Sequence, residues 1–297
     1  MFVVSLIARP HHLSPASVEA VRQAWGGGEI RWLAEAEAAE FDMGHAPDRF
    51  RDVWEGLQAL EVDLNLQPAE GRRKRMLLAD MDSTMIGQEC IDELADAAGV
   101  GAHVAGITAR AMNGELDFEA ALTERVGLLK GLDVSVIQQV LDSRITPAPG
   151  GRELVATMKA HGAYCALVSG GFTAFTRRVA GWFGFDENRA NELLEADGKL
   201  TGAVARPILG REAKVEALDE ISAMMGLELS QVMAVGDGAN DLGMLRKAGA
   251  GVALHAKPAV AAECELRINH ADLTALLYLQ GYHRDEFETG AAQPIFS

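Results

Sequence analysis

The second half of the chain alternates short apolar runs with amphipathic helical segments, and this alternation constrains the fold more than any other feature. In chain order the predicted elements are helix 151–161, strand 163–168, helix 172–183, helix 211–225, strand 232–236, helix 241–248, strand 251–254, a strand near 266–268 and helix 271–280. Strands and helices at this spacing form a parallel sheet covered on both faces. Ligands bind such sheets beyond the carboxyl ends of the strands, so the residues that follow each strand are the candidate functional residues.

The rest of the chain follows two other patterns. Residues 1–70 run in the order β-α-β-β-α-β, which predicts a small α+β ferredoxin-like domain. The apolar strand MLLA ends at Asp80, and residues 87–146 after it show helical spacing with almost no strand pattern. The predicted organisation is a domain at 1–70 and a second domain at 71–297, with its core at 71–86 and 147–297 and a helical insert at 87–146.

Charge and composition exclude several classes of function. The chain has 297 residues, of which 48% are hydrophobic, and a net charge of −16. Such a charge repels nucleic acids and anionic membranes, so neither is an expected partner. An anionic substrate would need a local positive field, which a bound divalent cation supplies. Three cysteines give no disulfide framework and fit a cytoplasmic protein, and the apolar start MFVVSLIA is too short for a signal peptide.

Polar residues follow three of the predicted strands. They are Asp80 and Asp82 after the first strand, Ser169 and Gly170 at the end of the second, just before a helix opens, and Asp237, Asn240 and Asp241 after the third, with Lys214 in the helix before that strand. Taken singly, each group is more typical of a turn or a solvated surface. The basic run from Arg72 to Arg75 is likewise expected to be a solvated connector. Only the occurrence of all these groups in one sheet favours a catalytic site.

The four groups, in this order, resemble the motifs of the haloacid dehalogenase superfamily of phosphotransferases. They stand here as Asp80-x-Asp82-Ser-Thr, Ser169, Lys214 and Gly236-Asp237-Gly-x-Asn240-Asp241. The resemblance covers roughly residues 74–270. It implies an α/β fold with a doubly wound parallel-sheet core, and the helical insert is similar to the cap domain of that superfamily.

Further stretches resemble the phosphoserine phosphatases within the superfamily. They are residues 80–89, 107–112, Phe118, Arg125-Val126, 144–147, 168–172 and 235–241. The resemblance implies Mg²⁺-dependent hydrolysis of O-phosphoserine to serine and phosphate, the last step of serine biosynthesis, through an aspartyl phosphate. Residues 1–70 lie outside the match and loosely resemble the ACT-like extensions of some of these enzymes.

The same resemblance assigns the chemical roles at the sheet. Asp80 is the expected nucleophile, and Asp82 the general acid and then base. Mg²⁺ is expected on the side chains of Asp80 and Asp237 and on the backbone carbonyl of Asp82. Lys214 would offset the negative charge of Asp80 and the phosphate.

Binding residues are also implied by the resemblance. Ser169 and the Gly170 amide would hold phosphate oxygens, while Asn240 and Asp241 would support the metal site and Lys214. From the insert, Arg125 would bind the substrate carboxylate and Glu89 would face its ammonium group. Met112 and Phe118 would close over the pocket and exclude water.

Other functions stay open at this stage. A phosphotransferase, or a phosphatase for another small phosphorylated alcohol such as phosphohomoserine, would use the same motifs. A signalling receiver also combines acids and a lysine, but the insert and Asp82 argue against it. A ligand sensor with an inactive second domain conflicts with the intact acid pair. The sequence leaves open the ligand of residues 1–70, serine feedback, formation of a homodimer, and preference for L- or D-phosphoserine.

Overall fold

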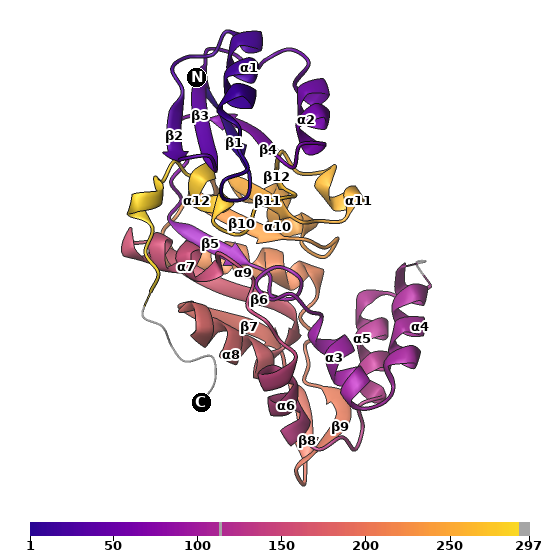
Figure 1. Cartoon of the computed structure of the whole chain (residues 1–297). Helices are drawn as coiled ribbons and strands as arrows, with labels where there is room; N and C mark the ends of the chain where they lie inside the picture. Colours follow the sequence, from indigo (N-terminus) through magenta and orange to yellow (C-terminus); the bar gives the residue numbers. More distant parts are fainter. Residues whose placement is uncertain (113–114, 291–297) are drawn as a thin grey trace.

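The molecule has three parts that follow one another across Figure 1. The computed structural model describes residues 1–112 and 115–290, apart from the side chains of residues 111 and 112. An N-terminal domain lies at one end, the parallel sheet lies in the middle, and the inserted helices lie at the other side of the sheet (Figure 1). Within the described ranges, no helix combines the length and apolar character needed to cross a membrane.

The N-terminal domain is the predicted ferredoxin-like unit. Its elements are β1 (Phe2–Ile7), α1 (Pro15–Trp25), β2 (Arg31–Ala34), β3 (Ala38–Met43), α2 (Phe50–Gln58) and β4 (Asp63–Pro68). The sheet order is β2-β3-β1-β4, with β1 antiparallel to both neighbours. Alternate residues of β1 serve two cores, because Val4 and Leu6 pack under the helices while Ile7 joins the core of the central sheet.

The central sheet is parallel, and its strand order explains where the site lies. Its strands are β5 (Met76–Ala79), β6 (Tyr164–Phe172), β7 (Glu187–Asn191), β10 (Val232–Gly236), β11 (Ala250–Leu254) and β12 (Leu266–Ile268), in the order β12-β11-β10-β5-β6-β7. The surrounding helices are α7 (Gly151–Ala160), α8 (Thr173–Phe183), α9 (Arg211–Met225), α10 (Leu242–Lys247), α11 (Pro258–Ala261) and α12 (Ala275–Leu279). β5 is central, between β10 and β6, so the three polar groups predicted after these strands become neighbours.

Both faces of this sheet are buried, which confirms the doubly wound fold. Leu77 and Ala79 of β5 belong to one apolar cluster, and Met76 and Leu78 belong to another on the opposite face. Alternation of fully buried residues between two clusters is the expected result of helices on both sides of a parallel strand. The three cysteines are free and buried.

The insert after β5 forms a helical cap. Its helices are α3 (Cys90–Ala97), α4 (Gly101–Met112), α5 (Phe118–Gly127) and α6 (Ser135–Ser143). The chain enters and leaves the cap at one place, where Ile86 and Pro147 form an antiparallel bridge and Gly87 N donates to Thr146 O at 3.1 Å. The exact boundaries drawn from the sequence remain a proposal.

A hairpin from the core also holds the cap. β8 (Leu193–Ala196) and β9 (Lys199–Val204) meet at Asp197 and Gly198, whose φ angles of 52° and 74° are those of a two-residue hairpin turn. Gly131 N donates to Leu200 O at 2.8 Å, and Val134 N donates to Gly198 O at 3.0 Å. The hairpin is therefore hydrogen-bonded to the segment between α5 and α6 (Figure 1).

The connector between the two domains is solvated only in part: Arg73 and Arg75 are exposed, as expected, but the expectation is wrong for Arg72 and Lys74, which are half-buried. Arg72 is only 15% exposed and lies 2.6 Å from the carboxylate of Glu40, which is 3% exposed. The Arg73 guanidinium stacks on the Tyr282 ring at 4.0 Å, and Lys74 Nζ donates to Ser230 O at 2.7 Å. The cause is the buried Glu40, since a carboxylate removed from water needs a cationic partner.

Asp63 makes a second tie between the domains. Its buried carboxylate accepts from the backbone amides of Asn269, His270 and Ala271 at 2.7–3.1 Å. These three bonds fix the loop between β12 and α12 of the core. The N-terminal domain therefore supports the core and is not merely attached to it.

Removal of residues 1–70 is expected to destabilise the remaining protein. The loop at 269–271 loses its hydrogen bonds to the Asp63 carboxylate, and the apolar core residues that pack against Ile7 of β1 become exposed. We expect the fragment to melt at least about 5 °C below the full chain, or to aggregate. The measurement is calorimetry of both proteins, with full-length Asp63→Asn as a milder version of the same loss. A fragment that melts with the full chain would show that the junction contributes no stability.

Candidate active site

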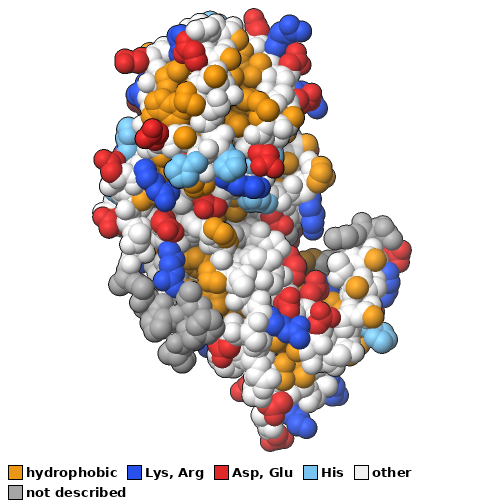
Figure 2. Space-filling model, viewed as in Figure 1, with side chains coloured by type: hydrophobic (Ala, Val, Ile, Leu, Met, Phe, Trp, Pro, Cys, Tyr) orange, Lys and Arg blue, Asp and Glu red, His pale blue; other side chains and the backbone are white. Residues whose placement is uncertain are grey.

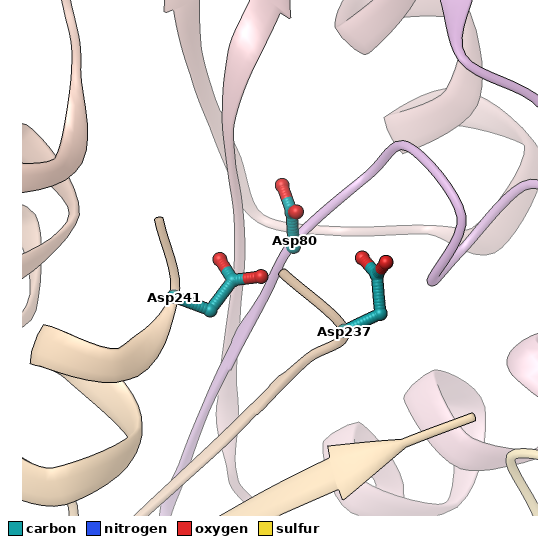
Figure 3. A group of neighbouring side chains, drawn as sticks. All are labelled: Asp80, Asp237 and Asp241. Atoms are coloured by element: carbon teal, nitrogen blue, oxygen red, sulfur yellow. The ribbon is translucent and has the colours of Figure 1, made fainter. Parts of the chain in front are cut away.

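Three carboxylates from separate elements meet at the carboxyl end of the sheet. Asp80 follows β5, Asp237 follows β10, and Asp241 directly precedes α10 (Figure 3). One oxygen of each lies within 4.8 Å of the others. The sequence separates Asp80 from the other two by more than 150 residues, and the pairing of β5 with β10 brings them together.

Lys214 lies inside this acid group. Its Nζ is 2.6 Å from Asp80 Oδ1 and 2.6 Å from Asp241 Oδ1, and its side chain is 1% exposed. Burial lowers the pKa of an ammonium, but the charges of Asp80 and Asp241 outweigh burial, and the pKa of Lys214 is raised. Lys214 is therefore protonated and holds the Asp80 carboxylate in a fixed position.

The acid group is short of positive charge. Three carboxylates face one ammonium, and burial together with the Asp241 charge raises the pKa of Asp80. Burial, followed by the charges of Asp241 and Glu89, raises the pKa of Asp237 to about 6. Asp241 is already occupied, because its Oδ1 binds Lys214 and its Oδ2 accepts from Gly238 N at 3.0 Å. Asp80 and Asp237 keep oxygens for a hard divalent cation, so the donor set fits one.

Asp82 has the properties of a proton-transfer group. Its Oδ1 is buried and has no hydrogen-bond partner among the described residues. Burial, and then the Glu89 charge, raises the pKa of Asp82 to about 7, while contacts with Cys90 oppose the shift. A carboxyl group with a pKa near neutrality can both give and take a proton in the cell.

The segment 169–171 faces Asp82 from the next strand. A Cβ at Gly171 would lie 3.0 Å from Asp82 Oδ2 and 3.1 Å from Ser169 Oγ, so glycine there lets the carboxyl and hydroxyl groups come close. β6 runs on through this segment to Phe172 and α8 begins at Thr173, so a helix opens directly after the segment, as the sequence predicts. The Asn191 side chain holds this segment extended by donating to Gly170 O at 2.9 Å.

Asn240 lies in the turn between Asp237 and Asp241. A Cβ at Gly238 would overlap the Asn240 side chain, and one at Gly236 would overlap the Asp241 carboxyl group. Glycine at both positions therefore permits the tight turn that presents these polar side chains together.

The cap covers this end of the sheet. The Phe118 ring lies against two glycines of the core, since a Cβ at Gly170 or Gly210 would be 3.1 Å from its carbons. Ser83 Oγ donates to Glu89 Oε1 at 2.8 Å at the start of the cap. Burial lowers the pKa of Arg125, and the charges of Asp92, Glu89 and Asp82 oppose the shift. Met112 ends α4, and its side chain lies outside the described part of the structure.

Sequence reasoning missed two residues of this site. Thr84 Oγ1 lies 3.4 Å from Asp237 Oδ1 and joins the loop after β5 to the acid group. Gly210, which precedes α9, is one of the two glycines against which the Phe118 ring packs. The Ser-Thr pair after Asp82 could have indicated Thr84, but nothing in the sequence indicates the contact at Gly210.

A family model decides the relationship of this chain to known proteins. The model for haloacid dehalogenase-like hydrolases matches residues 77–246, more than half of the chain. The chain belongs to this family. It is 45% identical to a phosphoserine phosphatase of Streptomyces coelicolor, in an alignment that covers 77% of this chain and 56% of that protein. It is 41% identical to a phosphoserine phosphatase of Methanocaldococcus jannaschii, in an alignment that covers 69% of this chain and 97% of that protein. The chain spans less than two thirds of several such relatives.

Solved structures of this hydrolase family share the fold. A family hydrolase of Salmonella enterica serovar Typhi superposes with a TM-score of 0.86 at 29% identity, covering 96% of this chain and 100% of that one. A substrate-bound phosphoserine phosphatase superposes with a TM-score of 0.65 at 40% identity, covering 69% of this chain and 97% of that one. The superposition on the Salmonella hydrolase covers nearly the whole chain and so includes the N-terminal domain, whereas the superposition on the phosphoserine phosphatase covers a shorter part of the chain.

Proposed function

We propose that the protein is a Mg²⁺-dependent phosphatase that hydrolyses O-phosphoserine to serine and phosphate. The observation that carries the proposal is the Asp80 carboxylate, held by buried Lys214 at the end of the central strand, two residues from Asp82. A fixed nucleophile beside a proton donor is what a two-step phosphomonoester hydrolysis needs. The names of the relatives at 41–46% identity support phosphoserine as the substrate.

In the first step Asp80 attacks phosphorus. A bond forms between an Asp80 oxygen and phosphorus, the bond from phosphorus to the serine oxygen breaks, and Asp82 gives its proton to that oxygen. Lys214 offsets part of the negative charge, and Ser169 with the Gly170 amide binds phosphate oxygens. A bound Mg²⁺, held by Asp80, Asp237 and the Asp82 carbonyl and supported by Asn240 and Asp241, supplies further charge neutralisation.

In the second step water releases the phosphate from Asp80. Asp82, now ionised, takes a proton from the water as its oxygen bonds to phosphorus. The bond from phosphorus to the Asp80 oxygen breaks, and the Asp80 carboxylate is restored. The raised pKa of Asp82 suits this exchange of roles.

Substrate choice would come from the cap. Arg125 binds the serine carboxylate and Glu89 its ammonium group, while Phe118 excludes water. The deciding experiment supplies Mg²⁺ and a panel of L-phosphoserine, D-phosphoserine, phosphothreonine, phosphohomoserine and glycerol phosphate, and measures phosphate release. Release of serine and phosphate in equal amounts supports the proposal. A clear preference for phosphohomoserine, or transfer of phosphate to an added alcohol, would contradict it.

Removal of the metal is expected to stop turnover. Extensive dialysis against EDTA leaves the acid group with Lys214 as its main counter-charge, so attack by Asp80 on a dianion should become undetectable. Mg²⁺ should restore activity, and Ca²⁺ should not, because calcium accepts both oxygens of a carboxylate and more ligands. Phosphate release after each addition is the measurement, and full activity after EDTA treatment would exclude a metal requirement.

Arg125→Ala should change the choice of substrate more than the chemistry. Loss of a charge-assisted hydrogen bond is expected to lower kcat/KM for phosphoserine by about ten- to a hundredfold. Hydrolysis of p-nitrophenyl phosphate, which has no carboxylate, should change little. The matched control is Arg110→Ala, since Arg110 pairs with Glu124 on the exposed side of the cap. An equal fall for both substrates would assign Arg125 to the fold or the phosphate site.

A further inference from the structure

Asn191 is a buried polar residue at the end of β7 that the mechanism above does not use. It is 2% exposed, and it lies opposite Phe172 in the register of β6 and β7. A buried side-chain amide needs partners for its two N–H donors and its oxygen acceptor. The partners of Asn191 come from two segments that border the candidate active site.

The first partner lies in a bulge of β6. The register of β6 against β7 shifts between Val168 and Phe172, where β6 has two residues more than β7. Segment 169–171, which the proposed mechanism assigns to the phosphate, lies in this bulge and leaves the regular ladder. Asn191 Nδ2 donates to Gly170 O at 2.9 Å and so takes the place of a bond between the strands.

The second partner lies in the segment before α9. Leu209 N donates to Asn191 Oδ1 at 2.7 Å, and Asn191 Nδ2 donates to Leu209 O at 3.0 Å. The side-chain amide thus pairs with both backbone groups of one residue, as a neighbouring strand would. Gly210 follows directly and precedes α9, the helix that carries Lys214. Asn191 therefore holds the start of that helix as well as the bulge.

The three bonds match the hydrogen-bonding groups of asparagine one for one. Both N–H groups face carbonyl oxygens and Oδ1 faces an N–H, so the partners determine the orientation of the amide. An aspartate would face the two carbonyls with no hydrogen to donate. A glutamine is one methylene longer and would change the distance between Gly170 and Leu209.

The placement of the groups in the bulge matters because their surroundings are acidic. Acidic side chains gather over α3, where the cap meets the core (Figure 2). Such a surface gives a phosphate dianion no general attraction, so binding depends on donors held at the end of the sheet. Ser169 Oγ accepts from Gly171 N at 2.8 Å, which leaves the hydroxyl hydrogen for a phosphate oxygen. Asn191 fixes the Gly170 carbonyl between these two residues.

The cap packs on both segments that Asn191 joins. A Cβ at Gly170 or at Gly210 would lie 3.1 Å from carbons of the Phe118 ring. The two glycines lie on opposite sides of Asn191, whose partners are Gly170 O and the backbone of Leu209. The separation of the two glycines therefore decides where the ring can pack.

We propose that Asn191 is a positioning residue, whose amide sets the distance between segments 169–171 and 209–210 and so places the phosphate donors and the surface that receives Phe118. The proposal rests on the phosphatase function proposed above. Asn191 acts through Gly170 and Leu209 and does not contact the substrate. Loss of its amide is expected to weaken the binding of every phosphate ligand, whatever alcohol carries the phosphate.

Asn191→Ala removes all three bonds and tests the proposal in the full chain. We expect kcat/KM to fall by about tenfold for both phosphoserine and p-nitrophenyl phosphate, because small displacements of binding groups have large effects on rate. Inorganic phosphate, titrated by calorimetry in the presence of Mg²⁺, should bind about threefold or more weakly. Arg125→Ala differs, since it should affect phosphoserine alone.

Asn188→Ala is the matched control on the same strand. Asn188 Oδ1 accepts from Thr176 Oγ1 of α8 at 2.8 Å, in a contact with neither of the two segments. This variant also loses a side-chain hydrogen bond and should melt at a lower temperature. Its kinetic constants and its affinity for phosphate should equal those of the wild type. The comparison separates positioning from a general loss of stability.

Asn191→Ser keeps the test decisive if the alanine variant is unstable, because a hydroxyl can still bond one of the two segments. The proposal is overturned if kcat/KM for both substrates and the affinity for phosphate change by less than about threefold in a folded variant. It is also overturned if only phosphoserine hydrolysis falls, or if neither variant folds, since Asn191 would then act in stability alone. A wild type that hydrolyses p-nitrophenyl phosphate but not phosphoserine would contradict the proposed substrate. The measurements with p-nitrophenyl phosphate and inorganic phosphate would still test Asn191.

Discussion

Asp80→Asn is expected to reduce phosphoserine turnover by about 10⁴-fold or more. An amide has no carboxylate oxygen with which to attack phosphorus, so the first step is lost. The fold should persist, because the substitution keeps the shape of the side chain and Lys214 retains its 2.6 Å contact with Asp241. Phosphate release and the melting temperature of the same sample measure both effects.

A matched substitution separates this effect from a change of surface charge. Asp219→Asn makes the same chemical change on exposed α9, where Asp219 pairs with Lys247. It should leave turnover unchanged. If Asp80→Asn keeps more than a few per cent of wild-type activity, Asp80 is not the nucleophile. Each tenfold loss of rate corresponds to about 1.4 kcal/mol of activation free energy.

Asp82→Asn is expected to slow turnover by about 10²- to 10⁴-fold, the usual contribution of a general acid and base. The loss should be smaller than for Asp80→Asn, because the nucleophile remains and can still attack. An asparagine can neither protonate the serine oxygen nor take a proton from water. Rapid-quench detection of the phosphorylated enzyme would show which of the two steps is slower.

The pH dependence of the wild type gives an independent test of Asp82. With the pKa of Asp82 raised to about 7, its proton is present below that pH and supports the first step. Above that pH the ionised form predominates and supports the second step. The wild-type rate should therefore fall on both sides of an optimum, and a bound cation shifts both limbs to lower pH. In Asp82→Asn the limbs due to this group should disappear, and an unchanged profile would exclude Asp82 from proton transfer.

Much of the fold follows from local patterns. The β-α-β-β-α-β order of residues 1–70 and the alternation of strands and helices after residue 150 are both present as predicted. Each of these depends on neighbours in sequence. The burial of Arg72 in the basic connector was not predicted, because its partner, Glu40, belongs to a distant strand whose burial no local pattern reveals.

The candidate site shows the same division. Motif order placed Asp80, Lys214 and Asp237 at one end of a parallel sheet, and the structure brings them together. The hydrogen bond from the Asn191 side chain to Gly170 O was not predicted, because Asn191 belongs to the adjacent strand. The contact of Phe118 with Gly210 could not be predicted, since it depends on how far the cap closes.

The hydrogen bonds between the cap and the hairpin of β8 and β9 have a consequence for engineering. In sequence the cap helices α3 to α6 form one continuous segment, which suggests that it could be exchanged between enzymes to change substrate choice. Physically, its α5–α6 segment is bonded to Leu200 and Gly198, more than fifty residues further along the chain. A transplanted cap would leave these backbone groups without partners. A functional chimera would need both segments from the same donor.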